Sequence, residues 1–143
     1  MIILNKSELK TRRVAWEIIK RATTRDRRLS DVTAEMFRIE GTNINDKDRR
    51  FITMLVQGTV RLTGRLDWEI RQVFIGQYED LKENLRILLR LGVYQIHYMN
   101  SVPDYAAVTT TVQLAKNIHN NLGGLTNAIL CTIIKEENKV ILD

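Results

Sequence analysis

The sequence predicts an all-α fold, a compact bundle of about six to seven helices formed by one domain that spans residues 1–143. Apolar residues recur with a helical period along the chain, and no segment has the alternating pattern of a strand pair. Residues 85–98 are apolar almost all round, which indicates a helix buried at the centre of a bundle. The only proline, Pro103, separates this segment from a second helix of small and β-branched residues.

The first helix is expected to begin at Ser7, as its N-cap, and to end near Thr23. Lys6, Arg13 and Lys20 fall on the face opposite its apolar residues. Those apolar residues recur at i, i+1, i+4, i+5 and i+8, and they are Val14, Ala15, Ile18, Ile19 and Ala22. A charged loop over residues 25–28 and a short helix over residues 30–38 follow.

Turn residues place the remaining helices. Asn45 or Asp46 caps a third helix, in which Gly58 permits a neighbouring helix to approach closely at a cost of about 1 kcal/mol relative to Ala. Gly64 is expected to mark the break before the next helix. Further helices are predicted over residues 66–74, 81–98, 104–119 and 125–137, with a turn over residues 120–124 and a frayed tail after Asn138.

Composition favours a cytoplasmic protein. Hydrophobic residues make up 44% of the chain and charged residues 27%, an ordinary globular balance. A single cysteine excludes an internal disulfide and suits a reducing compartment. No apolar run approaches the roughly 20 residues that span a bilayer, and the N-terminus does not resemble a signal peptide.

The sequence contains no enzyme signature and predicts no cofactor or metal. It has neither a Gly-x-Gly-x-x-Gly loop nor a phosphate-binding Gly-x-x-x-x-Gly-Lys loop. His97 and His119 lie too far apart to form a local metal pair, and no Cys/His cluster has zinc spacing. Cys131 lies in an amphipathic segment without a neighbour to activate it, which favours a packed structural thiol over a nucleophile.

Positive charge is concentrated at the N-terminus. Residues 1–28 contain nine Lys/Arg and three Asp/Glu, a net charge of +6, so the rest of the chain carries −1 of the total +5. Such asymmetry indicates a polyanionic partner: RNA, DNA or a membrane surface. The small residues of the first helix's apolar face disfavour a membrane. Trp16, beside the basic face, suits base stacking, although a basic face can also be merely solvated, with Glu17 paired to Arg21.

Two arginines of the apolar segment, Arg86 and Arg90, need partners because a buried guanidinium is costly unless paired. We expect them to emerge at an edge of the bundle, where they either meet carboxylates or form a second basic patch. Asp67, close to Arg61 and Arg65, can cap a helix or hold an arginine.

Together these segments resemble the RNA-binding domain of the NusB/RsmB type, found in antitermination factors and at the N-terminus of rRNA cytosine-C5 methyltransferases. The matching segments, in order, are Leu66-Asp67, Leu89-Arg90-Leu91-Gly92-Val93-Tyr94, Pro103, Leu114-Ala115-Lys116 and Asn127-Ala128-Ile129-Leu130. Three features bear on which version of this domain, the antitermination version or the methyltransferase version, the sequence is more similar to. Gly58-Thr59-Val60-Arg61 is more similar to the methyltransferase version, Thr109-Thr110 replaces an Asn-Glu pair, and Cys131 stands where the methyltransferase version has arginine.

The resemblance implies two small packed helical subdomains and binding of single-stranded RNA from ribosomal RNA leaders, in transcription antitermination, with a small ribosomal protein as a possible partner. It places RNA contacts on the basic N-terminal helix, at the residue before Leu66-Asp67, and in the turn that begins at Asn120. The RNA-binding residues predicted from charge and resemblance together are Lys6, Lys10, Arg12, Arg13, Trp16, Lys20, Arg65, Asn121 and Thr126.

Two other functions stay open at this point. The chain could be a detached targeting domain for a separate rRNA methyltransferase, or a protein-interaction scaffold without RNA contact. We expect no methylation by this polypeptide, since it has no methyl-donor-binding domain or catalytic Pro-Cys. Family members are monomers or homodimers, and the sequence does not choose between these states.

Overall fold

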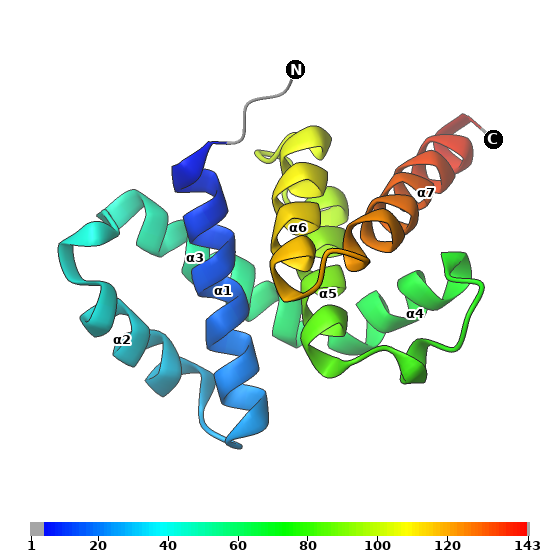
Figure 1. Cartoon of the computed structure of the whole chain (residues 1–143). Coiled ribbons are helices and arrows are strands. Elements are labelled where there is room, and N and C mark those ends of the chain that lie inside the picture. The colour runs from blue at the N-terminus through cyan, green and yellow to red at the C-terminus, as the bar shows by residue number, and fades with distance from the viewer. Residues whose placement is uncertain (1–4, 143) are drawn as a thin grey trace.

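The structure is a computed structural model that describes residues 5–142, with side chains described as far as Glu136. The described part of the chain contains seven α-helices and no strand, which confirms the all-α prediction (Figure 1). The helices are α1 (Lys6–Thr24), α2 (Leu29–Glu40), α3 (Asp46–Arg61), α4 (Thr63–Val73), α5 (Glu83–Tyr98), α6 (Asp104–Ile118) and α7 (Leu122–Leu142). Short 3₁₀ turns, η1 (Gly41–Asn43) and η2 (Tyr78–Asp80), precede α3 and α5.

The helices form two groups, α1–α3 and α4–α7, which meet along α5 (Figure 1). Helix α5 packs against α1, α3, α4, α6 and α7. Ten of its 16 residues are buried, which is why its sequence is apolar almost all round. The prediction of a central buried helix is confirmed, although α5 begins at Glu83, after η2, and not at Leu81.

The sequence predicts a close approach by a neighbouring helix at Gly58 of α3, and the structure places the Tyr94 side chain of α5 there. A Cβ atom added at Gly58 would lie 2.0 Å from the Tyr94 hydroxyl oxygen. The Tyr94 ring fills this space and stacks on Tyr98, with ring centroids 5.5 Å apart. Glycine therefore makes room for an aromatic ring between the two groups of helices.

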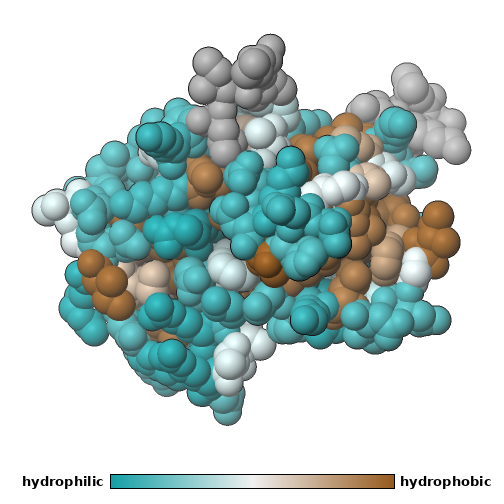
Figure 2. All heavy atoms as spheres, in the orientation of Figure 1, coloured by the Kyte–Doolittle hydropathy of each residue, from teal (hydrophilic) through white to brown (hydrophobic). Residues whose placement is uncertain are grey.

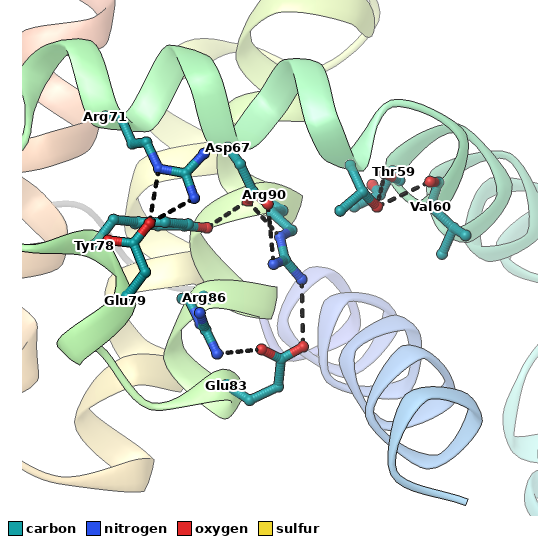
Figure 3. Close-up of polar contacts among 10 residues, drawn as sticks. Thr59, Val60, Asp67, Arg71, Tyr78, Glu79, Glu83, Arg86 and Arg90 are labelled. Carbon is teal, nitrogen blue, oxygen red and sulfur yellow. Dashed lines mark hydrogen bonds and ion pairs between the residues drawn. The ribbon is translucent and has the colours of Figure 1, made fainter. Parts of the chain in front are cut away.

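Local hydrogen bonds move several predicted helix ends. The α1 N-cap is Asn5 and not Ser7, because the Asn5 side chain accepts from the backbone N–H groups of Ser7 and Glu8. Helix α4 begins before Gly64, at Thr63, whose hydroxyl donates to the carbonyl oxygens of Thr59 and Val60 at 3.3 and 2.8 Å (Figure 3).

The last helix also differs from its prediction. The turn was predicted over residues 120–124, but α7 begins at Leu122 and includes both glycines in its first turn. It continues to Leu142, beyond the predicted end at residue 137. Thr126 helps to hold this first turn, since its hydroxyl donates to the Leu122 carbonyl at 2.7 Å.

Candidate nucleic-acid interface

Helix α1 presents a basic face to solvent. Lys6 and Arg13 are exposed, and Lys10 and Lys20 are half-buried beside them. We call these four residues the α1 basic face. Hydrophilic residues predominate on the molecular surface over α1 and α2, whereas more of the apolar surface gathers toward α4 and α7 (Figure 2).

Acidic side chains neutralise this region only in part. Glu40, at the end of α2, forms ion pairs with both Lys10 at 3.5 Å and Arg13 at 3.4 Å. Glu17 forms ion pairs with Lys20 and Arg21, which confirms the expected Glu17–Arg21 pair. Glu35 of α2 forms ion pairs with Arg21 and Arg27.

Five cations therefore share three carboxylates, and an excess charge of +2 remains within this set alone. These pairs are accessible to solvent, and such pairs contribute only about 0–1 kcal/mol each. A phosphate group can therefore replace a carboxylate at little cost.

The structure removes Arg12 from the candidate RNA-contacting surface. Its side chain is only 7% exposed, with Nε donating to the Gln95 side-chain oxygen on α5 at 2.9 Å. The guanidinium carbon lies 4.5 Å from the centroid of the Phe51 ring on α3. Burial lowers the pKa of Arg12, and the charges of Glu8 and Asp48 act in the opposite direction. Arg12 of α1 thus contacts both α3, through Phe51, and α5, through Gln95, and it joins these three helices in the interior.

Trp16 is half-buried and joins α1 to the start of α5. Its indole N–H donates to the Asn84 carbonyl at 3.0 Å. The Lys20 ammonium lies 4.3 Å from the centroid of its ring. The indole is therefore anchored in the protein, which makes Trp16 less accessible for base stacking than the sequence predicts.

The other predicted contacts lie on different elements. Arg65, on α4, is exposed and pairs with Glu69 at 3.6 Å. Asn121 is exposed in the α6–α7 turn, where its backbone N–H donates to His119 Nδ1 at 3.2 Å. Thr126 is fully buried, which contradicts its prediction as a contact residue.

A half-buried polar network fixes α4 against η2 and α5 (Figure 3). Asp67 accepts hydrogen bonds from the Tyr78 hydroxyl at 2.5 Å and from Arg90 Nε at 2.7 Å. Burial and the Asp67 hydrogen bond raise the pKa of Tyr78. Glu83 accepts ion pairs from both Arg86 and Arg90 at the start of α5. The two arginines therefore meet carboxylates and do not form a second basic patch, and Asp67 holds an arginine.

Sequence reasoning missed Glu35 and Glu40, the two α2 carboxylates that face α1. They lie more than ten residues away in sequence from the cations that they bind on α1, so no local spacing signals the contact. It also missed that Arg50 and Arg61 share one exposed face, although their spacing of 11 residues, about three helical turns, could have indicated it.

His97 and Cys131 each contact a polar side chain of the protein. His97 Nδ1 lies 3.2 Å from Glu69, and the half-buried Cys131 thiol donates to the Asn127 amide oxygen at 3.7 Å. Across the described residues, no group of three or more His, Cys, Asp or Glu could hold a metal ion. No helix within the same part of the chain is both long and apolar enough to cross a membrane.

Among curated relatives, the chain is similar to a probable ribosomal RNA small subunit methyltransferase B of Synechocystis. The two are 34% identical over 140 residues, which cover 94% of this chain and 30% of the relative. The chain thus spans about a third of the length of the methyltransferases that it matches.

Two solved structures share the fold. A chain in the crystal structure of a plectonemic RNA supercoil superposes with a TM-score of 0.80 at 24% identity, covering 93% of this chain and 97% of that chain. A chain in the crystal structure of antitermination factors NusB and NusE in complex with dsRNA also gives 0.80, at 23% identity, covering 93% and 99%. The model of the NusB family matches residues 9–135, nearly the whole sequence, and the chain therefore belongs to the NusB family.

Proposed function

We propose that this chain is a non-catalytic, cytoplasmic RNA-binding domain that uses the α1 basic face to hold the phosphates of single-stranded RNA from ribosomal RNA leaders. The observation that carries the proposal is the unbalanced ion pairing around α1, where five cations share three carboxylates. A strand that binds there exchanges weak surface ion pairs for contacts with phosphates and releases its counterions.

Three of the predicted residues form the centre of this surface. Lys6 has no ion pair within the described residues, and Lys10 and Arg13 share a single carboxylate. Lys20 extends the surface toward Trp16. Asn121 and Arg65 lie on other elements and are proposed as outlying contacts.

The structural neighbours support an RNA partner, because they come from crystals of an RNA supercoil and of a NusB–NusE–dsRNA complex. We extend the proposal to transcription antitermination, with a small protein partner beside the RNA. The strand type and the process are our inference from the basic face and family membership.

A second function has support of its own. The relative from Synechocystis is a probable rRNA methyltransferase and is 34% identical to this chain. The domain could therefore target a methyltransferase activity to ribosomal RNA, in which case structured rRNA and not a leader strand is its preferred ligand.

Fluorescence anisotropy tests both functions. The purified protein is titrated into a single-stranded leader oligonucleotide, a scrambled strand and an rRNA hairpin across a salt series. We expect the leader strand to bind most tightly, with an affinity that falls as salt rises. Tightest binding to the hairpin supports the targeting domain, and no binding at low salt refutes autonomous RNA recognition.

Charge-reversal variants locate the site. Lys10→Glu/Arg13→Glu removes two proposed phosphate contacts and should reduce the slope of log affinity against log salt by about 1.4, at roughly 0.7 per contact with a single strand. Arg28→Glu/Arg38→Glu is a matched control, because both arginines are exposed and have no ion pair within the described residues. Circular dichroism confirms that each variant is folded.

A further inference from the structure

A line of exposed side chains runs along α3 and continues along α4. Its members recur every three or four residues, the spacing of one helical face. Ile52, Leu55 and Leu66, which lie between them, are fully buried. We call the exposed set the α3–α4 line, and it consists of Arg50, Met54, Gln57, Arg61, Arg65 and Trp68.

The helical period continues across the junction of the two helices. The Leu62 N–H donates to the Gly58 carbonyl at 3.1 Å, and the Leu66 N–H donates to the Leu62 carbonyl at 2.8 Å. The backbone therefore keeps turning in the same sense through the break. Arg61, at the end of α3, and Arg65, in α4, are therefore separated by about one helical turn although they belong to different helices.

The α3–α4 line carries three positive charges and no carboxylate of its own. Within the described residues, Arg50 and Arg61 have no carboxylate within 4.0 Å, the limit for an ion pair. Arg65 pairs with Glu69 at 3.6 Å, and the same carboxylate oxygen lies 3.2 Å from His97 Nδ1. The line therefore attracts a polyanion on a face separate from the α1 basic face.

Trp68 adds an accessible aromatic ring at one end of the α3–α4 line. It is 50% exposed, so half of the side chain can be reached from solvent. The Arg65 guanidinium carbon lies 4.7 Å from the centroid of the ring, and Glu69 holds that arginine from the next turn. A cation held beside an exposed ring is suited to stack on a nucleobase while it neutralises the adjacent phosphate.

We propose that the α3–α4 line is a second contact surface for single-stranded RNA. Arg50 and Arg61 hold phosphates, and the Arg65–Trp68 pair stacks on a base. At a rise of about 1.5 Å per residue, Arg50 and Trp68 are separated by up to roughly 27 Å, enough to follow several nucleotides. The inference rests on the proposed RNA-binding function but assigns a different face of the protein.

Tryptophan fluorescence provides a direct test, because the chain contains only two tryptophans. Trp16→Phe leaves Trp68 as the single reporter, in a full-length protein that is titrated with a 12-nucleotide single-stranded leader RNA. We expect stacking to quench Trp68 fluorescence as the RNA binds. We also expect Trp68→Ala to weaken binding about tenfold, a typical loss for one stacked base.

Arginine variants test the phosphate contacts. In the single-reporter protein, Arg50→Glu/Arg61→Glu should weaken binding at least tenfold and reduce the salt slope by about 1.4. The matched Arg28→Glu/Arg38→Glu control changes net charge equally and should leave the quenching intact. Circular dichroism is recorded for all variants, so that an unfolded protein is not mistaken for one that has lost contacts.

The outcomes separate this inference from the proposed function. If the wild-type protein binds no RNA by anisotropy, both fail together. If RNA binds and Lys10→Glu/Arg13→Glu weakens it, but Trp68 fluorescence does not change and Arg50→Glu/Arg61→Glu matches its control, only the α3–α4 line is refuted. That result is also the one expected if the line binds an acidic protein segment in place of RNA.

Discussion

Arg12 offers the sharpest test of the structure, because the sequence places it among the RNA contacts and the structure places it in the interior. In Arg12→Met, the buried Gln95 side-chain oxygen loses its donor at 2.9 Å, and the contact with Phe51 loses its charge. An unsatisfied buried acceptor costs about 1–3 kcal/mol. A cation over an aromatic ring contributes about 0.5–2 kcal/mol, so we expect a total loss of about 1.5–5 kcal/mol.

Urea denaturation measures this loss. For a domain of this size, with a slope of about 1–3 kcal/mol/M, the urea midpoint should fall by about 0.5 M or more. Gln95→Leu alone should also destabilise the protein, because it leaves the Arg12 Nε–H without its acceptor. The double variant Arg12→Met/Gln95→Leu should recover much of the stability, since apolar groups of similar size then replace both partners.

RNA anisotropy on the same variants completes the test. The folded fraction of Arg12→Met should bind RNA with wild-type affinity, because the side chain lies beneath the surface. An unchanged urea midpoint together with a clear loss of RNA affinity would falsify the assignment of Arg12 to the interior.

Three further predictions follow from local geometry. Gly58→Ala should destabilise the protein by up to about 2 kcal/mol in urea denaturation, because displacing the Tyr94 ring costs about 1–3 kcal/mol against a helix-propensity gain of about 1 kcal/mol; a more stable variant would contradict this packing. Asn5→Ala should lower the free energy of unfolding by about 1 kcal/mol through loss of the α1 cap, with Asn5→Asp as the retained-cap control. Tyr78 has a raised pKa in the folded state, so its contribution to stability should be complete below about pH 10 and then fall by up to about 1.4 kcal/mol per pH unit above it. Between pH 9 and 11, the free energy of unfolding should decline less steeply in Tyr78→Phe than in the wild-type protein. Equal declines in the two proteins would refute the contribution of Tyr78 ionisation.

Much of the fold follows from local patterns. Apolar residues at a helical period predicted the helices, and the nearly uniform apolar character of residues 85–98 predicted that α5 is central. The Glu17–Arg21 pair was also predictable, since both partners lie on one helix at i, i+4. Gly58 was identified as a close approach because a missing side chain inside a helix needs a reason in packing.

Helix ends were predicted less well because competing caps lie close together in the sequence. Asn5 and Ser7 are both good N-caps, and the chosen one is the residue whose side chain reaches the free N–H groups. Gly123 and Gly124 suggested a turn, but α7 includes them because its first turn gains the Thr126 hydrogen bond and packs against α6. Propensity is a weak term that such contacts outweigh.

The sequence by itself determined the helical class, the central helix and the concentration of positive charge at the N-terminus. Only the tertiary structure decided what each charge does. Arg12 differs from Arg13 by one position, yet one is buried on Gln95 of α5 and the other reaches solvent beside Glu40 of α2. Arg90 likewise finds Asp67, 23 residues earlier in the chain. The physical reason is that burial and ion pairing depend on residues distant in sequence, whereas periodicity and net charge are local sums.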